Sequence, residues 1–210
     1  MPQYDLLHIY DSGTNALTRF DFSLRSADVT LAVKATRTGI VYRNRAFGMT
    51  FDRQVPVQVE LGGTQALLDA LDNLVAKGAA FKRAVVSSHG SPGAISIGNE
   101  RIDSSTLRRC FANKGYDRLF PLFTRMGFVG CNVADGDQGW AFLEAAANIF
   151  FKSMGGIAFG WDSAGLAIPF HSVHLWGDCR YVVAAPGGFV IDRYTEMEQF
   201  KRKFPNMSWL

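Results

Sequence analysis

Two apolar runs, each leading to a reactive side chain, constrain this chain more than any other feature. Residues 84–86 read Ala-Val-Val and lead through two serines to His89, and residues 127–130 lead to Cys131. Apolar runs bounded by turn residues are typical of parallel strands buried on both faces. As neighbouring parallel strands, they would deliver His89 and Cys131 to the same carboxyl edge of one sheet, where open α/β sheets place their chemistry.

The residue types at these two strand ends suit nucleophilic catalysis. A free thiol has a pKa of about 8.5, so it needs a base or a cationic neighbour to react as a thiolate at neutral pH. A histidine on the adjacent strand supplies that base for Cys131. Gly90 lets the backbone come close to a ligand, and the amides of Gly90 and Cys131 can both point at a developing oxyanion.

Each of these residues also has a purely structural interpretation. Free cysteines are among the most buried residue types, so Cys131 could be a core cysteine, and His89 could cap a strand. The polar residues after Cys131 and the glycine after His89 place both at strand exits, which favours catalysis. Cys110 and Cys179 lack this setting, and we expect them to be inert.

Size and composition narrow the class of protein. The chain has 210 residues, 48% of them hydrophobic and 20% charged, which suits one globular α/β domain. The net charge of +3 comes from scattered basic residues, which argues against a nucleic-acid partner. Three cysteines without paired spacing argue against a disulfide framework and a zinc ribbon, and favour a reducing compartment.

No membrane partner is expected from the sequence, because no run of about 18 apolar residues occurs. The first residues, Met-Pro-Gln-Tyr-Asp, do not resemble a secretory signal. We therefore expect a cytoplasmic protein, with export by a route that needs no N-terminal signal left open.

The pattern of strands and helices predicts one domain with two parts. Residues 1–61 form a β-rich N-terminal extension, expected as an antiparallel meander on the sheet edge, and residues 62–210 form the main part. Strand, helix, strand, helix, strand from 84 to 161 predicts a mainly parallel sheet. The expected strands are 5–10, 17–23, 29–35, 40–51, 55–61, 84–88, 94–97, 127–130 and 157–161, with a hairpin over 173–192. The first expected helix begins near residue 62 and ends at Gly78. The region 104–125 is expected to be helical in two pieces broken at Gly115, and two further helices are expected over 139–153 and 195–204.

Two further candidate sites follow the main motifs. Asp162 ends the strand after the nucleophile helix, and two interpretations stay open: a turn-forming aspartate or a carboxylate that binds a cationic substrate side chain. His171 and His174 are spaced as an H-x-x-H pair, but no cysteine or acidic cluster at ligand spacing accompanies them. We therefore expect no metal and no cofactor.

The motifs resemble a known group of enzymes. Ser-His-Gly-Ser-Pro-Gly-Ala at 88–94 and Gly-Cys-Asn-Val-Ala at 130–134 resemble the caspase-like superfamily of cysteine peptidases, which includes caspases, gingipains, clostripain-type enzymes and separases. The match is most similar to bacterial CHAT-like domains and covers about residues 64–165. It implies a caspase-like αβα sandwich, a His89/Cys131 dyad and an oxyanion donor at Gly90. In several relatives that cut after Arg or Lys, an aspartate near the position of Asp162 lines the specificity pocket.

The chain also departs from parts of that group. True caspases carry Gln-Ala-Cys-x-Gly, where this chain has Val-Gly-Cys-Asn-Val at 129–133. Metacaspase-like relatives keep an acid two residues before the cysteine, where this chain has Val129. The resemblance therefore implies neither cleavage after aspartate nor dependence on calcium.

The resulting prediction is a cysteine endopeptidase that hydrolyses protein or peptide substrates, with preference for Arg or Lys before the cut as one option. The substrate is another protein, with its own chain or a partner effector protein as candidates. Two alternatives stay open. One is a non-catalytic interaction module that kept the fold, since fold similarity does not establish activity. The other is a different thiol enzyme, such as an acyltransferase.

Overall fold

The computed structural model of the chain describes residues 3–11, 28–36, 39–45, 58–60, 63–97, 100–168, 171–174 and 178–205. The predicted strand at 17–23 lies outside these residues. Residues 46–51 of the predicted strand 40–51 also lie outside them, as do residues 55–57 and 61 of the predicted strand 55–61.

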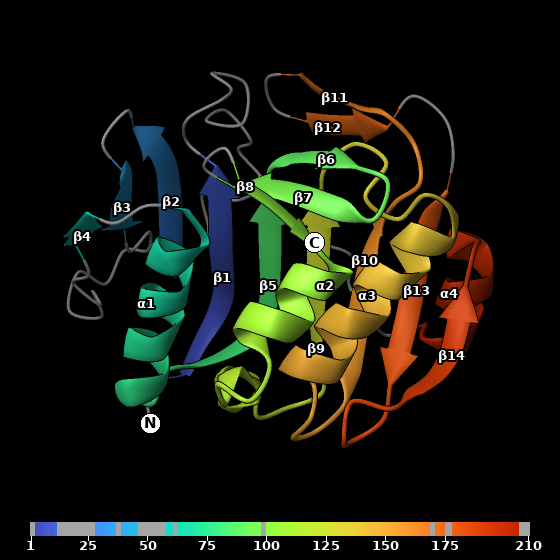
Figure 1. Ribbon diagram of the computed structural model, residues 1–210. Helices are drawn as coiled ribbons and strands as arrows, with labels where there is room; N and C mark the ends of the chain where they lie inside the picture. The colour runs from blue at the N-terminus through green and yellow to red at the C-terminus, as the bar shows by residue number, and fades with distance from the viewer. Residues whose placement is uncertain are drawn as a thin grey trace.

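A nine-stranded sheet organises the described residues (Figure 1). Its order is β14-β13-β10-β9-β5-β1-β2-β3-β4. The five strands from β10 to β2 run parallel, and the pairs on either side of them are antiparallel. The strands are β1 (Gln3–Asp11), β2 (Val29–Thr36), β3 (Gly39–Arg45), β4 (Gln58–Glu60), β5 (Ala80–Ser87), β9 (Thr124–Val129), β10 (Gly156–Trp161), β13 (Cys179–Ala184) and β14 (Val190–Tyr194). The prediction of an α/β fold with a mainly parallel central sheet is confirmed.

The first strand departs from the expected antiparallel meander. β1 lies inside the sheet, parallel to both β5 and β2, and only β3 and β4 continue antiparallel beyond β2. Leu6, Leu7 and Ile9 are all buried, although their side chains alternate between the two faces of the sheet. A strand buried on both faces reads as an apolar run, and residues 6–9 are apolar except for His8, which is also buried.

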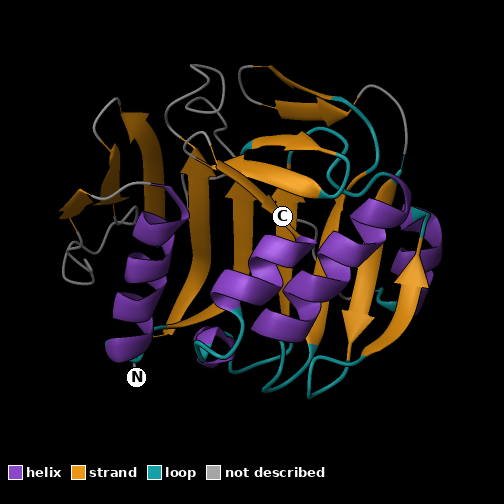
Figure 2. Cartoon of the chain, in the orientation of Figure 1, coloured by secondary structure: helices purple, strands orange, loops and turns teal. Residues whose placement is uncertain are grey.

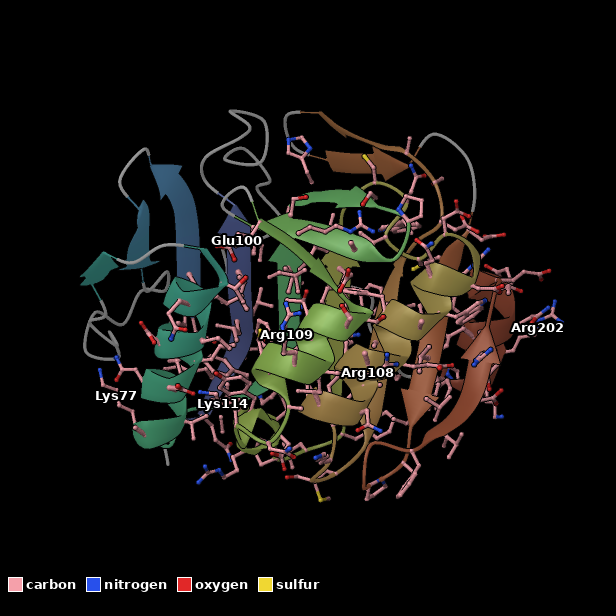
Figure 3. All side chains as sticks on the ribbon, viewed as in Figure 1. Lys77, Glu100, Arg108, Arg109, Lys114 and Arg202 are labelled. Carbon is pink, nitrogen blue, oxygen red and sulfur yellow. The ribbon has the colours of Figure 1, made fainter. Side chains whose placement is uncertain are left out.

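One face of the sheet is covered by the longer helices (Figure 2). These elements are α1 (Gly63–Ala76), α2 (Ser104–Thr106) continued by a π-helical segment (Leu107–Phe111), a 3-10 turn (Tyr116–Leu119) and α3 (Gly136–Phe150). Leu71 of α1 and Phe142 of α3 are buried in one apolar core with strand residues such as Phe128. Glu100 lies near the upper end of α1 in Figure 3 and accepts the backbone N–H of Thr64, which satisfies a donor in the first turn of that helix.

A smaller layer covers the opposite face. α4 (Met197–Lys203) contacts β13 and β14, and its Phe200 stacks on Tyr181 with ring centroids 4.2 Å apart. Phe159 of β10 joins this second core, whereas its neighbour Ala158 faces the first. The alternation along β10 shows that the sheet is packed on both faces there, as an αβα sandwich requires.

Short strands lie across the carboxyl ends of the parallel strands. β6 (His89–Ser91), β7 (Ala94–Ile97) and β8 (Glu100–Asp103) form a three-stranded sheet above β5 and β9 in Figure 1. β11 (Gly165–Ile168) and β12 (His171–His174) form a separate pair. Within the described part of the chain, no helix is both long and apolar enough to cross a membrane.

Several elements have different bounds in the structure from those predicted. The region 104–125 is helical only to Phe111 and again over the 3-10 turn, and β9 already begins at Thr124. Gly115 does break it, at a left-handed φ of 74°, a conformation glycine adopts without steric cost. The predicted hairpin over 173–192 is shorter, because residues 171–174 pair with β11 and only β13 and β14 flank the turn at 186–188.

Candidate active site

The two segments singled out in the sequence lie side by side. β5 and β9 are adjacent and parallel, and Ser87 of β5 pairs with Val129 of β9 at their carboxyl ends. The pairing extends one step further, because the Ser88 N–H donates to the Val129 carbonyl at 3.2 Å. His89 and Cys131 each follow two residues after the last pair, so the structure brings both to one edge of the sheet, as the sequence predicts.

The backbones of the two segments touch just beyond the strands. A β-carbon placed on Gly90 would lie 2.5 Å from the Cys131 carbonyl oxygen and 2.9 Å from the Cys131 nitrogen. Both distances are shorter than real β-carbon contacts allow, so only glycine fits at position 90 without a shift of the backbone. Gly130 contributes to the same close approach, because its own β-carbon would lie 3.2 Å from the Gly90 α-carbon.

The hairpin that carries His89 is fastened to the segment after Cys131. β6 and β7 pair antiparallel around the turn at residues 92 and 93. The Gly93 N–H donates to the carbonyl of Val133 at 3.1 Å, and the Val133 side chain is fully buried in the main core. The position of His89 relative to Cys131 is therefore set by the tertiary structure as well as by the adjacent strands.

The segment from Cys131 to Asp135, called here the Cys131 turn, has a defined conformation. Asn132 has a left-handed φ of 56°, which is uncommon outside glycine but most tolerated by Asn and Asp. The Asn132 N–H donates to the Ser163 carbonyl at 2.9 Å, and the Ala134 N–H donates to the Trp161 carbonyl at 2.9 Å. These two bonds attach the Cys131 turn to the exit of β10, and α3 begins directly after it.

The three cysteines differ in how far their side chains are exposed to solvent. Cys131 is half-buried, and His89 is exposed. Cys179 is buried among aromatic residues, and burial raises the pKa of its thiol to about 12. Cys110 is half-buried and packs against the main core. All three cysteines are described by the structure, and no disulfide joins them.

Asp162 lies at the same edge, but its carboxylate already has partners. Its Oδ1 accepts the backbone N–H of Asp178 at 2.7 Å, and its Oδ2 lies 3.4 Å from Nε of Arg180. The Asp162 N–H in turn donates to the Asp178 carbonyl at 3.1 Å. The side chain is 19% exposed. The Asp162 side chain therefore contacts the segment that leads into β13.

Arg180 is the residue of this region that the sequence analysis did not identify. Among the described residues, it contacts Asp162 and the carbonyl of Gly136, which lie 18 and 44 positions away along the chain. No local pattern marks such a residue, because helical and strand periodicities report only on near neighbours.

Among the side chains that the structure describes, no group of three or more His, Cys, Asp or Glu residues lies close enough together to hold a metal ion. The side chains of His171 and His174 are outside that description, although their backbones form β12. The H-x-x-H pair therefore stays untested.

Comparison with known proteins gives two matches of different kinds. Residues 50–153 match the family described as "Domain of unknown function (DUF4347)", a range that includes both His89 and Cys131. A comparison with curated proteins finds no matching sequence. One similar solved structure is that of a secreted C11 cysteine protease from Bacteroides thetaiotaomicron in complex with an irreversible peptide inhibitor, with a TM-score of 0.41 and 15% sequence identity. The match covers 77% of this chain and 49% of that chain, so this chain spans about half the length of the protease.

Proposed function

We propose that the chain is a cysteine endopeptidase in which Cys131 is the nucleophile and His89 the general base and acid. The observation that carries this proposal is the contact between the Gly90 and Cys131 backbones at the shared edge of β5 and β9. This contact supports the proposal because it fastens the loop that carries His89 to the loop that carries the half-buried thiol of Cys131. A nucleophile and a base brought together at a loop exit are the minimum that thiol catalysis needs.

The proposed reaction has two stages. His89 takes the proton of the Cys131 thiol, and the sulfur attacks the carbonyl carbon of the substrate peptide bond. The C–N bond then breaks, and the imidazolium gives its proton to the leaving amine, which leaves a thioester on Cys131. Water then attacks the thioester carbonyl while His89 takes a proton from that water. The C–S bond breaks, the imidazolium returns the proton to the sulfur, and the acid product departs, which restores the thiol and the neutral histidine.

The oxyanion of each tetrahedral intermediate is proposed to bind the backbone N–H groups of Gly90 and Cys131. Fixed backbone donors stabilise such a charge without reorganising during the reaction, and removal of one donor costs about 10²-fold or more in related chemistry. The close approach of the two residues supports this assignment, because both amides belong to backbone that is packed together.

Asp162 is the proposed binding group for an Arg or Lys side chain before the cut. A guanidinium and a carboxylate form paired, charge-assisted hydrogen bonds. The substrate cation would share this carboxylate with Arg180, which lies 3.4 Å away. A carboxylate has about four acceptor positions, so two partners leave room for a third.

A peptide library tests the activity directly. The protein and its Cys131→Ala variant are incubated with the library, and the cleavage sites are mapped by mass spectrometry. Cleavage by the parent protein that disappears in the variant supports the proposal. A parent protein that cleaves nothing, while Cys131 reacts with iodoacetamide no faster than Cys110, would favour a non-catalytic interaction module. Product formed only when an amine acceptor is added would indicate an acyltransferase.

A further inference from the structure

Arg180, at the start of β13, makes three contacts with the two segments next to the Cys131 turn. Its Nη1 donates to the carbonyl of Gly136, the first residue of α3, at 3.0 Å. Its Nε lies 3.4 Å from the carboxylate of Asp162, just after β10. Its guanidinium carbon also lies 5.3 Å from the centre of the Trp140 ring on α3. With a side chain only 18% exposed, Arg180 lies between the end of β10 and the start of α3.

The Cys131 turn is supported by the same two elements. On one side, its N–H groups at Asn132 and Ala134 donate to the carbonyls of Ser163 and Trp161, which flank Asp162. On the other side, the turn leads directly into α3, whose Gly139 is packed so closely against the Ala134 backbone that a β-carbon would not fit. Arg180 thus joins the two supports of the turn without belonging to the turn itself.

The turn needs this support because one of its residues has an unfavourable backbone conformation. A left-handed φ at a residue other than glycine costs energy and persists only where the surrounding contacts fix it. Asn132, with a φ of 56°, comes directly after Cys131. A change in the distance between β10 and α3 would weaken the two hydrogen bonds of the turn and release this conformation.

We infer that Arg180 is a positioning residue, which holds the end of β10 and the start of α3 at the separation that keeps the Cys131 turn in its reactive conformation. Arginine suits this role because its planar guanidinium can donate to a carbonyl, pair with a carboxylate and stack on an aromatic ring at the same time. The inference rests on the proposed function for its catalytic consequence, but its structural consequence can be measured without substrate.

A second arginine provides a matched control. Arg193 of β14 also lies over the Trp140 ring, with its guanidinium carbon 5.4 Å from the ring centre, and it forms an ion pair with Glu144. Its side chain is 53% exposed, and both of these contacts are to α3 and do not reach the end of β10, so Arg193 does not join the two supports of the turn. Loss of Arg193 therefore removes a comparable stacked arginine without loosening the turn.

The test compares Arg180→Met, Arg180→Lys and Arg193→Met by amide hydrogen exchange of residues 131–135 in the absence of substrate. Arg180→Met should speed exchange at Asn132 and Ala134 by about tenfold or more, because local opening becomes easier. Arg180→Lys should lie between Arg180→Met and the parent protein, since an ammonium can pair with Asp162 but cannot form the planar stack. Arg193→Met should match the parent. Unchanged exchange in Arg180→Met would overturn the inference, and if that variant does not fold, unchanged exchange in Arg180→Lys would do so.

Kinetics with a cleaved peptide then test the catalytic consequence. Misplacement of the Cys131 turn should lower kcat by about tenfold or more in Arg180→Met, since small displacements of reacting groups are costly. For a substrate with an aliphatic residue before the cut, KM should change by less than about threefold, because such a substrate does not use the Asp162 carboxylate that Arg180 contacts. An unchanged kcat in a protein whose turn exchanges faster would overturn the catalytic part of the inference. A parent protein that cleaves no peptide contradicts the proposed function instead, and the exchange data still decide the role of Arg180.

Discussion

The backbone of Gly90 lies against that of Cys131, so that a β-carbon on residue 90 would stand 2.5 Å from the Cys131 carbonyl oxygen. This contact joins the loop after β5 to the loop after β9, whose last paired residues are Ser87 and Val129. It also sets how closely a histidine on one loop can approach a thiol on the other.

Replacement of Gly90 by alanine should therefore damage the site. The added methyl would overlap with backbone atoms, which cannot rotate away as a flexible side chain can. We expect the two loops to separate and the turnover of peptide substrates to fall by about 10²-fold, in line with the sensitivity of catalysis to displacements near 1 Å.

Gly160→Ala is the matched control for that change. A β-carbon at Gly160 in β10 would have its nearest neighbours at 3.5 Å, an ordinary van der Waals contact. Peptide turnover in the control should stay close to that of the parent protein. Equal activities in Gly90→Ala and the parent would show that the close approach is not needed for catalysis.

The two reactive side chains should be essential to cleavage and unimportant to folding. Cys131→Ala and His89→Ala should each abolish peptide cleavage, while the free energy of unfolding changes by only about 1 kcal/mol, a typical value for a point change. His89 is exposed and Cys131 half-buried, so neither substitution leaves a large cavity. Urea unfolding and cleavage assays check both parts, and EDTA should leave activity unchanged. Full cleavage by Cys131→Ala, or loss of cleavage with EDTA, would refute the thiol mechanism.

The three thiols should differ sharply in their rate of alkylation. Near pH 6.5, Cys131 should react with iodoacetamide far faster than Cys110 or Cys179, because in the proposed mechanism His89 takes the proton of the Cys131 thiol as it reacts. Cys179 should react slowest, since burial raises the pKa of its thiol to about 12 and keeps it protonated. Peptide mapping of the labelled protein gives each rate. A Cys131 rate no higher than that of Cys110 would argue against an activated nucleophile.

Substitution of Asp162 tests the proposed preference for basic residues. Asp162→Asn should lower the turnover of substrates with Arg or Lys before the cut by about tenfold more than it lowers the turnover of substrates with an aliphatic residue there. A tenfold change in rate corresponds to about 1.4 kcal/mol in activation free energy. The comparison between substrate classes is needed because Asp162 also pairs with Arg180. An equal loss for both classes would leave Asp162 with a structural role only.

The carboxylate of Asp103 should make stability depend on pH in acid. It accepts the N–H of Thr106 and the hydroxyl of Ser105, and these bonds lower its pKa from 3.8 to about 2. A lowered pKa stabilises the folded state fully above about pH 4, and this contribution is lost as the pH falls towards 2.

Asp103→Ala should therefore reduce the free energy of unfolding by about 1 kcal/mol at pH 7, the usual cost of a lost helix cap, and by progressively less below pH 4. Urea unfolding at several pH values measures this. Asp103→Asn is the control, because asparagine keeps the cap acceptor and cannot titrate. A parent protein whose pH dependence between 4 and 2 equals that of Asp103→Asn would contradict the prediction.

Most elements can be predicted from the sequence because their signals are local. The glycines at 78 and 115 mark the stops they were expected to mark, and the run at 94–97 coincides with β7. β1 was misplaced for an equally physical reason. Aromatic and β-branched residues with turn signals after them favour a meander, but the buried pairing of β1 with β5 joins residues more than 70 positions apart.

By itself, the sequence determined the two strand ends that present His89 and Cys131, because apolar runs and the turn residues that end them depend only on neighbours along the chain. The tertiary structure alone decided what surrounds them. The contact of Gly90 with Cys131, the partners of Asp162 and the position of Arg180 join segments 16 to 44 residues apart. Such contacts arise only when the sheet brings distant strands together, since no local backbone preference encodes which side chains will then meet.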